Sequence, residues 1–114
     1  MNSNIRGKAG EAMAADFLRA RGYTILDAGY RSAFGEIDLI AKKRNCVAFV
    51  EVKLRKNDRF SRACEAVTPA KQDRLRQTAL QWVSQYGEPK ECRFDVIEIY
   101  TQTGEICHLE GAFV

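Results

Sequence analysis

Two acidic residues, Asp38 and Glu51, lie on either side of a short polar stretch, and apolar residues flank each of them. If the two-residue loop Arg44-Asn45 joins two antiparallel strands, residues whose numbers add up to 89 face each other, and Asp38 faces Glu51. Opposed side chains have Cβ atoms about 4.5–5.5 Å apart, where like charges destabilise a sheet unless a positive charge lies between them. A hard divalent cation such as Mg²⁺, typically held by one or two carboxylates with waters and phosphate oxygens, would supply that charge.

Lys53 lies two residues beyond Glu51 and is therefore expected on the same face of the strand. Its ammonium group would contact a phosphate there, and it could also help to position or deprotonate an attacking water. By the same register Glu36 faces Lys53, and an ordinary cross-strand ion pair is an equally good interpretation of these two residues. Ile37 and Leu39 are expected together on the opposite, apolar face.

A further carboxylate comes from an N-terminal helix expected over residues 8–21. Glu11 shares a helical stripe with Ala15 and Leu18, which directs it toward the inward face. A carboxylate there needs a partner, and the metal cluster is one candidate. A structural alternative stays open, because an acid in a first helical turn also favours the helix N-terminus.

The elements that must position these groups follow from periodicity and from turn signals. Strands are expected at 23–27, 36–42, 46–54, 93–100 and 105–109, with a loop over 29–35. Thr68-Pro69 predicts the start of a second helix, and Gly87 its end. Trp82 and Tyr86 are expected in its buried stripe. The order α-β-β-β-α-β-β predicts an α/β fold with a mixed sheet, as one domain over residues 1–114.

Basic residues follow the charged strand directly. They are Arg55, Lys56, Arg59 and Arg62. A basic loop beside a metal site would suit phosphate tracking, although an ordinary solvated surface explains exposed Lys and Arg equally well. Lys71 lies near the N-terminal end of the second helix, where the helix dipole favours anions, and is predicted to contact phosphate.

The composition restricts the class of protein. With 114 residues, 46% of them hydrophobic and 29% charged, and a formal net charge of +3, the chain is expected to be globular and mildly basic, which permits a phosphate partner without requiring one. The N-terminus has no apolar stretch typical of a secretory signal, and no apolar run is long enough to span a membrane, so a cytoplasmic location without membrane association is expected. Cys46, Cys64, Cys92 and Cys107 are too widely spaced for a zinc site and are expected to be reduced, buried small side chains.

Several short segments match a known family in order and spacing. They are Gly10-Glu11, Gly35-Glu36-Ile37-Asp38-Leu39-Ile40, Phe49-Val50-Glu51-Val52-Lys53, Arg55, Lys71 and Arg93-Phe94-Asp95-Val96. Together they resemble the YraN family of uncharacterised bacterial proteins over nearly the whole chain. That family is similar to archaeal Holliday junction resolvases, and both belong to the PD-(D/E)XK superfamily of restriction-endonuclease-like folds.

The resemblance implies a role for each matching residue. Asp38 corresponds to the aspartate of the superfamily motif, Glu51 to its second acidic residue, Lys53 to its lysine, and Glu11 to an additional helix carboxylate. Asp38, Glu51 and Glu11 are then the expected ligands of Mg²⁺ or Mn²⁺. Two further residues, Glu36 and Arg31, are expected to support the site.

The residues and the resemblance together predict a metal-dependent nuclease that hydrolyses phosphodiester bonds. The resemblance implies DNA rather than RNA, in a branched or otherwise structured form, and by analogy a homodimer. Two alternatives stay open. A non-catalytic nucleic-acid-binding module of the same fold would bind independently of Glu51, and a protein-interaction subunit would show no salt-dependent affinity for DNA.

Overall fold

Helices and strands follow one another in the order expected from the sequence. The computed structural model describes residues 3–55 and 67–114, and the side chains of residues 8–55 and 67–114. Its elements are α1 (Ser3–Ala20), β1 (Thr24–Ser32), β2 (Gly35–Lys43), β3 (Cys46–Arg55), α2 (Pro69–Tyr86), β4 (Glu91–Tyr100) and β5 (Glu105–Phe113). The predicted order α-β-β-β-α-β-β is confirmed.

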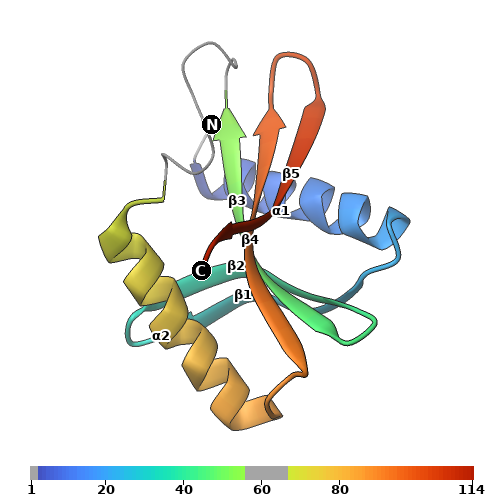
Figure 1. Ribbon diagram of the computed structural model, residues 1–114. Coiled ribbons are helices and arrows are strands. Elements are labelled where there is room, and N and C mark those ends of the chain that lie inside the picture. The colour runs from blue at the N-terminus through green and yellow to red at the C-terminus, as the bar shows by residue number, and fades with distance from the viewer. Residues whose placement is uncertain (1–2, 56–66) are drawn as a thin grey trace.

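The strands form a sheet in the order β1-β2-β3-β4-β5. β3 and β4 are parallel, and the other neighbouring strands are antiparallel. Parallel strands need a long crossover, which includes α2. The two helices pack against opposite faces of the sheet (Figure 1). This mixed sheet between two helices confirms the α/β class and is consistent with a restriction-endonuclease-like fold.

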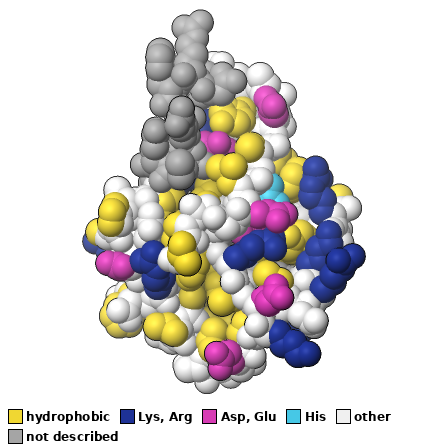
Figure 2. Space-filling view, in the orientation of Figure 1, with side chains coloured by type: hydrophobic (Ala, Val, Ile, Leu, Met, Phe, Trp, Pro, Cys, Tyr) yellow, Lys and Arg dark blue, Asp and Glu magenta, His cyan; other side chains and the backbone are white. Residues whose placement is uncertain are grey.

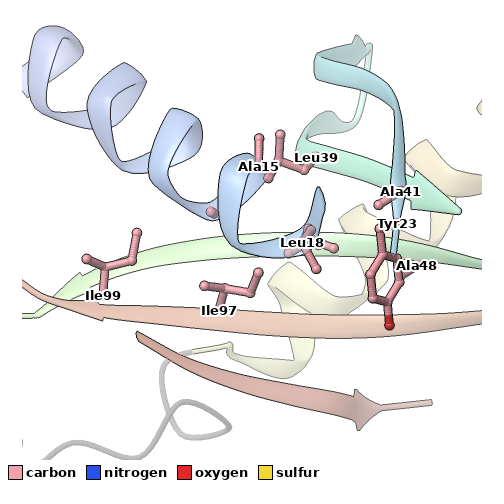
Figure 3. Close-up of a cluster of buried hydrophobic side chains, with 10 residues drawn as sticks. Ala15, Leu18, Tyr23, Leu39, Ala41, Ala48, Ile97 and Ile99 are labelled. Atoms are coloured by element: carbon pink, nitrogen blue, oxygen red, sulfur yellow. The ribbon is translucent and has the colours of Figure 1, made fainter. Parts of the chain in front are cut away.

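Strand β3 is covered on both faces. Ala48 packs on the α1 side in a cluster that includes Leu18 (Figure 3), whereas Val47 and Phe49 pack on the α2 side in a cluster that includes Trp82. Because successive residues of a strand point to opposite faces, a strand covered on both sides has a nearly continuous apolar sequence. This explains why β3 is the most hydrophobic segment around the charged residues.

The ends of α2 lie where the sequence placed them. The Thr68 side chain accepts a hydrogen bond of 3.2 Å from the backbone N–H of Lys71, and Pro69 occupies the first turn. The helix ends before Gly87, whose φ of 101° favours glycine. Trp82 is buried as expected, but the expectation of a buried Tyr86 is wrong because 65% of its surface is exposed.

The hairpin between β2 and β3 has the predicted register. Its pairs run from Lys43–Cys46 to Leu39–Val50, and in each pair the residue numbers add up to 89. The turn residue with left-handed backbone is Arg44, with φ of 57°.

The prediction of a loop over residues 29–35 is wrong for most of that segment. β1 continues through Gly29, with φ of 70°, to Ser32, and Arg31 pairs with Glu36 of β2. Pairing with β2 satisfies the backbone polar groups of this segment. The turn-forming residues in the sequence gave no indication of this pairing.

The cysteine prediction is partly wrong. Cys46, Cys92 and Cys107 have free thiols, as expected, but Cys92 is exposed and the other two are only partly buried. Cys64 lies outside the described residues. Within the described ranges, no helix is long and apolar enough to cross a membrane.

Candidate active site

Three carboxylates from two elements meet at the end of β2 that lies near α1. Glu11 comes from α1, and Glu36 and Asp38 come from β2. Each offers an oxygen, and these oxygens all lie within 4.8 Å of one another. All three side chains are partly buried. The N-terminal helix therefore does bring Glu11 to Asp38, while Glu36 belongs to the carboxylate group itself, beyond the supporting role expected from the sequence.

Asp38 lies where β2 separates from β3. The backbone ladder between the two strands ends at Leu39–Val50, one residue before Asp38 would pair with Glu51. Here the Oδ2 atom of Asp38 accepts a hydrogen bond of 2.8 Å from the backbone N–H of Val52. A side-chain oxygen thus satisfies a backbone donor of β3 beyond the point where the ladder with β2 ends.

The expected division into one apolar and one charged face is wrong at this point. Leu39 packs in the cluster on the α1 side, whereas Ile37 packs on the α2 side. Two residues apart in a regular strand would share a face, so the alternation of β2 breaks between them. The break permits Asp38 to lie with Glu11 on the α1 side although Ile40 points toward α2.

Glu51 is held by two lysines. Its Oε1 atom lies 2.7 Å from Lys71 Nζ and 3.4 Å from Lys53 Nζ, and its side chain is 8% exposed. Lys71 comes from the start of α2, so Glu51 is tied to the helix on its own side of the sheet. The sequence predicted Lys71 as a phosphate contact, and this carboxylate contact was missed because only the packing of α2 creates it.

Lys53 connects the two parts of the site. It lines a cavity of about 250 Å³ together with Glu11, Asp38, Val52 and Leu54, and it also pairs with Glu51. Lys53 is therefore a neighbour of both Asp38 and Glu51. The hairpin argument also placed Asp38 and Glu51 opposite each other on one face as ligands of one ion, and this is wrong: the two residues do not pair in the ladder, and Glu51 contacts lysines on the α2 side and is not a member of the carboxylate group.

The carboxylates repel one another in a partly desolvated place. Burial, followed by the negative charge of Glu51, raises the pKa of Asp38 to about 7, and Glu11 and Glu36 add to this effect against the hydrogen bond from Val52. Burial and the charge of Glu36 also raise the pKa of Glu11. A positive charge among these oxygens would relieve the repulsion.

The two lysines differ in how firmly they hold a proton. Burial and the neighbouring Lys71 lower the pKa of Lys53, which Glu51 only partly offsets. Burial also acts to lower the pKa of Lys71, but its hydrogen bond to Glu51 and its other contacts raise it overall. Lys71 is therefore the firmer ion-pair partner of Glu51.

The predicted ion pair between Glu36 and Lys53 is replaced by others. Glu36 Oε2 lies 3.4 Å from Nε of Arg31, whose side chain is 80% exposed, so this pair contributes little to stability. Arg31 nevertheless lies beside the carboxylate group, as expected of a supporting residue.

Of the basic residues that follow Lys53, the structure describes Arg55. Nε of Arg55 lies 3.1 Å from Oε2 of the buried Glu98, so this guanidinium compensates a buried carboxylate and is not simply a solvated phosphate contact. Lys56, Arg59 and Arg62, the other basic residues predicted to contact nucleic acid in this segment, lie outside the described residues.

The chain matches a known family over most of its length. The model of the uncharacterised protein family UPF0102 matches residues 10–99. The chain belongs to this family. UPF0102, the YraN family, is thus the family that the sequence motifs indicated.

Relatives in UPF0102 come from diverse bacteria. A UPF0102 protein of Thermodesulfovibrio yellowstonii is 42% identical over 107 residues, which cover 94% of each chain. One from Symbiobacterium thermophilum is 49% identical over 94 residues, 82% of this chain and 80% of the relative. A third, from Sulfurihydrogenibium sp., is 40% identical over 114 residues, 99% of this chain and 97% of the relative.

This UPF0102 chain has a second buried ionic cluster that sequence reasoning missed. Asp95, which is fully buried, accepts hydrogen bonds of 2.9 Å from Arg93 Nε and 3.0 Å from the backbone N–H of Gly111 and lies 2.8 Å from Nε2 of His108. Arg93 also bonds to the hydroxyl of Tyr23. The sequence did indicate that Arg93 and Asp95 could pair, because residues two apart in a strand lie on the same face. It gave no indication that His108 would join them.

A basic edge in this UPF0102 chain was also missed. Lys and Arg side chains gather along one side of the face in Figure 2, over the end of α1 and the β2–β3 hairpin of Figure 1. The basic residues of these two segments are Arg19, Arg21, Lys42, Lys43 and Arg44. The described chain therefore has a cationic surface some five residues along β2 from Asp38, roughly 16 Å at the usual rise of a strand.

Proposed function

We propose that this chain hydrolyses phosphodiester bonds of nucleic acid, DNA in preference to RNA, with a divalent cation, Mg²⁺ or Mn²⁺, as cofactor. The observation that supports it best is the group of Glu11, Glu36 and Asp38 oxygens within 4.8 Å of one another, beside Lys53. Carboxylates at the end of a sheet hairpin next to a lysine are what the resemblance to the PD-(D/E)XK superfamily leads one to expect.

The residues present fit a hard divalent ion. Carboxylate oxygens are the donors that Mg²⁺ and Mn²⁺ prefer. Like charges in a desolvated place raise the pKa of Asp38 to about 7, and a bound cation would reverse this cost. Glu11, Glu36 and Asp38 would hold the ion, whereas Glu51 is paired with Lys71 and Lys53. When bound, such an ion would polarise a phosphate and lower the pKa of a water.

The side chains around the carboxylates have their own parts in the reaction. The N–H of Val52 orients Asp38 through its hydrogen bond. Lys53, which lines the same cavity as Glu11 and Asp38, offsets negative charge on the phosphate as it develops during hydrolysis. Lys71 holds Glu51 on the α2 side of the site by an ion pair of 2.7 Å.

The test uses purified protein with single-stranded, duplex and branched DNA, with matched RNA, and with Mg²⁺, Mn²⁺ or a chelator. We expect at least one of these DNAs to be cleaved, and only when the ion is present. Asp38→Asn and Lys53→Met should each reduce its rate on the order of a hundredfold. Glu88→Gln, a change of the same kind at an exposed residue, should leave the rate unchanged. Equal cleavage by wild type and both site variants would attribute the activity to a contaminant and refute the proposal.

The same preparations separate the alternatives. Salt-dependent DNA binding without cleavage, unaffected by Glu51→Ala, would identify a nucleic-acid-binding module. Retention of a protein partner, without measurable affinity for DNA, would identify an interaction subunit. Direct Mn²⁺ binding, followed by electron paramagnetic resonance, should weaken in Asp38→Asn if the carboxylates hold the ion.

A further inference from the structure

An exposed aromatic side chain lies beside the carboxylate group. Phe34, in the turn between β1 and β2, is 51% exposed. It lines a cavity of about 250 Å³ with Glu36, Lys71, Arg74 and others. Glu36 is also a member of the carboxylate group, so this cavity adjoins the candidate active site directly.

The turn that presents Phe34 is fixed in place. The backbone N–H of Phe34 donates to Ser32 Oγ at 3.0 Å, and Ser32 Oγ lies 2.8 Å from Oγ1 of Thr78, which is fully buried in α2. Gly35, with φ of 153°, brings the backbone close enough that an added Cβ would lie 3.8 Å from Cβ of Arg74. The turn therefore lies against α2, as Figure 1 shows, and the hydrogen bond to Ser32, which in turn contacts the buried Thr78, fixes the backbone that carries the exposed ring.

The chemistry of the cavity suits a nucleotide. One wall is an aromatic ring, and another is formed by Leu75 and the guanidinium-bearing Arg74. The Arg74 side chain has no hydrogen bond or ion pair with any side chain among the described residues. Unpaired bases stack on aromatic rings and on guanidinium planes, and a guanidinium group attracts phosphate.

We propose that Phe34 and Arg74 form a stacking site for an unpaired base of the nucleotide next to the phosphodiester that is cleaved. This inference rests on the proposed function and adds a substrate class to it. In a continuous duplex each base face is covered by its neighbours, so Phe34 has no face to contact. A single strand, a flap or a branch point exposes one, and the chain therefore prefers nucleic acid with unpaired bases over intact duplex.

Binding measurements test the proposal without any need for cleavage. Fluorescence anisotropy with a labelled single-stranded oligonucleotide and with its duplex is measured in the presence of Ca²⁺ in place of Mg²⁺, and the recovered DNA is checked for integrity. Phe34→Ala should weaken single-strand binding about five- to a hundredfold, the range for loss of one stacked base, and leave duplex affinity nearly unchanged. Phe34→Tyr should restore single-strand affinity, because the ring is kept.

The control is Leu80→Ala, which also removes an exposed apolar side chain, 64% exposed and part of α2 but absent from this cavity. It should bind as wild type does. A further variant, Phe34→Trp, should show fluorescence quenched by the single strand and not by the duplex, against the constant signal of buried Trp82. Urea unfolding of each variant establishes that all are folded.

Several results would overturn the inference. They are equal single-strand affinity of Phe34→Ala and Leu80→Ala, equal loss of single-strand and duplex binding in Phe34→Ala, and no binding of either oligonucleotide by wild type. Failure of the nuclease proposal is seen separately. Stacking without cleavage in Mg²⁺ or Mn²⁺ would reject the nuclease and keep the stacking site, whereas metal-dependent cleavage that Phe34→Ala leaves unchanged, together with unchanged binding, would reject only the stacking site.

Discussion

Replacing Asp38 by asparagine is expected to stabilise the protein above neutral pH and to change its stability little in mild acid. Burial and the charge of Glu51 raise the pKa of Asp38 from 3.8 to about 7 in the folded protein. The unfolded chain releases this proton near pH 4, whereas the folded protein keeps it to about pH 7. The free energy of unfolding therefore falls as pH rises between these values and stays low above them.

The size of the effect follows from the two pKa values. From 3.8 to about 7 is about three pKa units, and each unit corresponds to about 1.4 kcal/mol, so the ionised carboxylate costs at most about 4 kcal/mol. Burial and the charges of Glu51, Glu11 and Glu36 together produce this shift of the Asp38 pKa, so the cost is spread over several interactions and we expect between about 1 and 4 kcal/mol. Asparagine keeps an oxygen that can accept the hydrogen bond from Val52.

Urea unfolding with a chelator at about pH 4.5 and about pH 8 measures this difference. The control is Asp16→Asn, at a site on α1 whose side chain is 81% exposed, which should have the same small effect at both pH values. Mg²⁺ should stabilise wild type at about pH 8 more than Asp38→Asn, since the ion binds the folded state. An effect of Asp38→Asn that is equal at both pH values, or destabilising at the higher one, would refute the reasoning.

Two further predictions concern the contacts that fix the turn and the second ionic cluster. Thr78→Val should lower the free energy of unfolding by about 1–2 kcal/mol, because the Ser32 hydroxyl loses its buried partner. A double-mutant cycle of Thr78→Val with Ser32→Ala, measured by urea unfolding, should show coupling between the two sites. The control cycle of Thr78→Val with Ser84→Ala should show none. Asp95→Asn should cost about 3–5 kcal/mol near neutral pH. Burial acts to raise the pKa of Asp95, but hydrogen bonds from His108 and Arg93 lower it overall, so the stabilisation is present above about pH 4 and is lost as pH falls below that; a loss equal at all pH values in urea unfolding would contradict this.

The parts of the fold that depend on local signals could be predicted from the sequence. Helix caps act within a few residues, which is why Thr68 and Gly87 locate the ends of α2. A two-residue turn sets the register of its hairpin, so the pairs from Lys43–Cys46 to Leu39–Val50 followed from the position of the loop. The residue types likewise identified Asp38 and Lys53 as neighbours within one site.

Contacts between distant elements were decided only by the tertiary structure. The backbone ladder between β2 and β3 ends at Leu39, and Asp38, which lies beyond that end, is turned toward α1. No residue near Asp38 in the sequence indicates that the ladder ends there. The packing of α2 brings Lys71 to Glu51, because the helix position depends on the whole core beneath it. The local sequence determines which side chains a strand carries, but the strands and helices packed against it determine the face of the sheet on which each side chain lies.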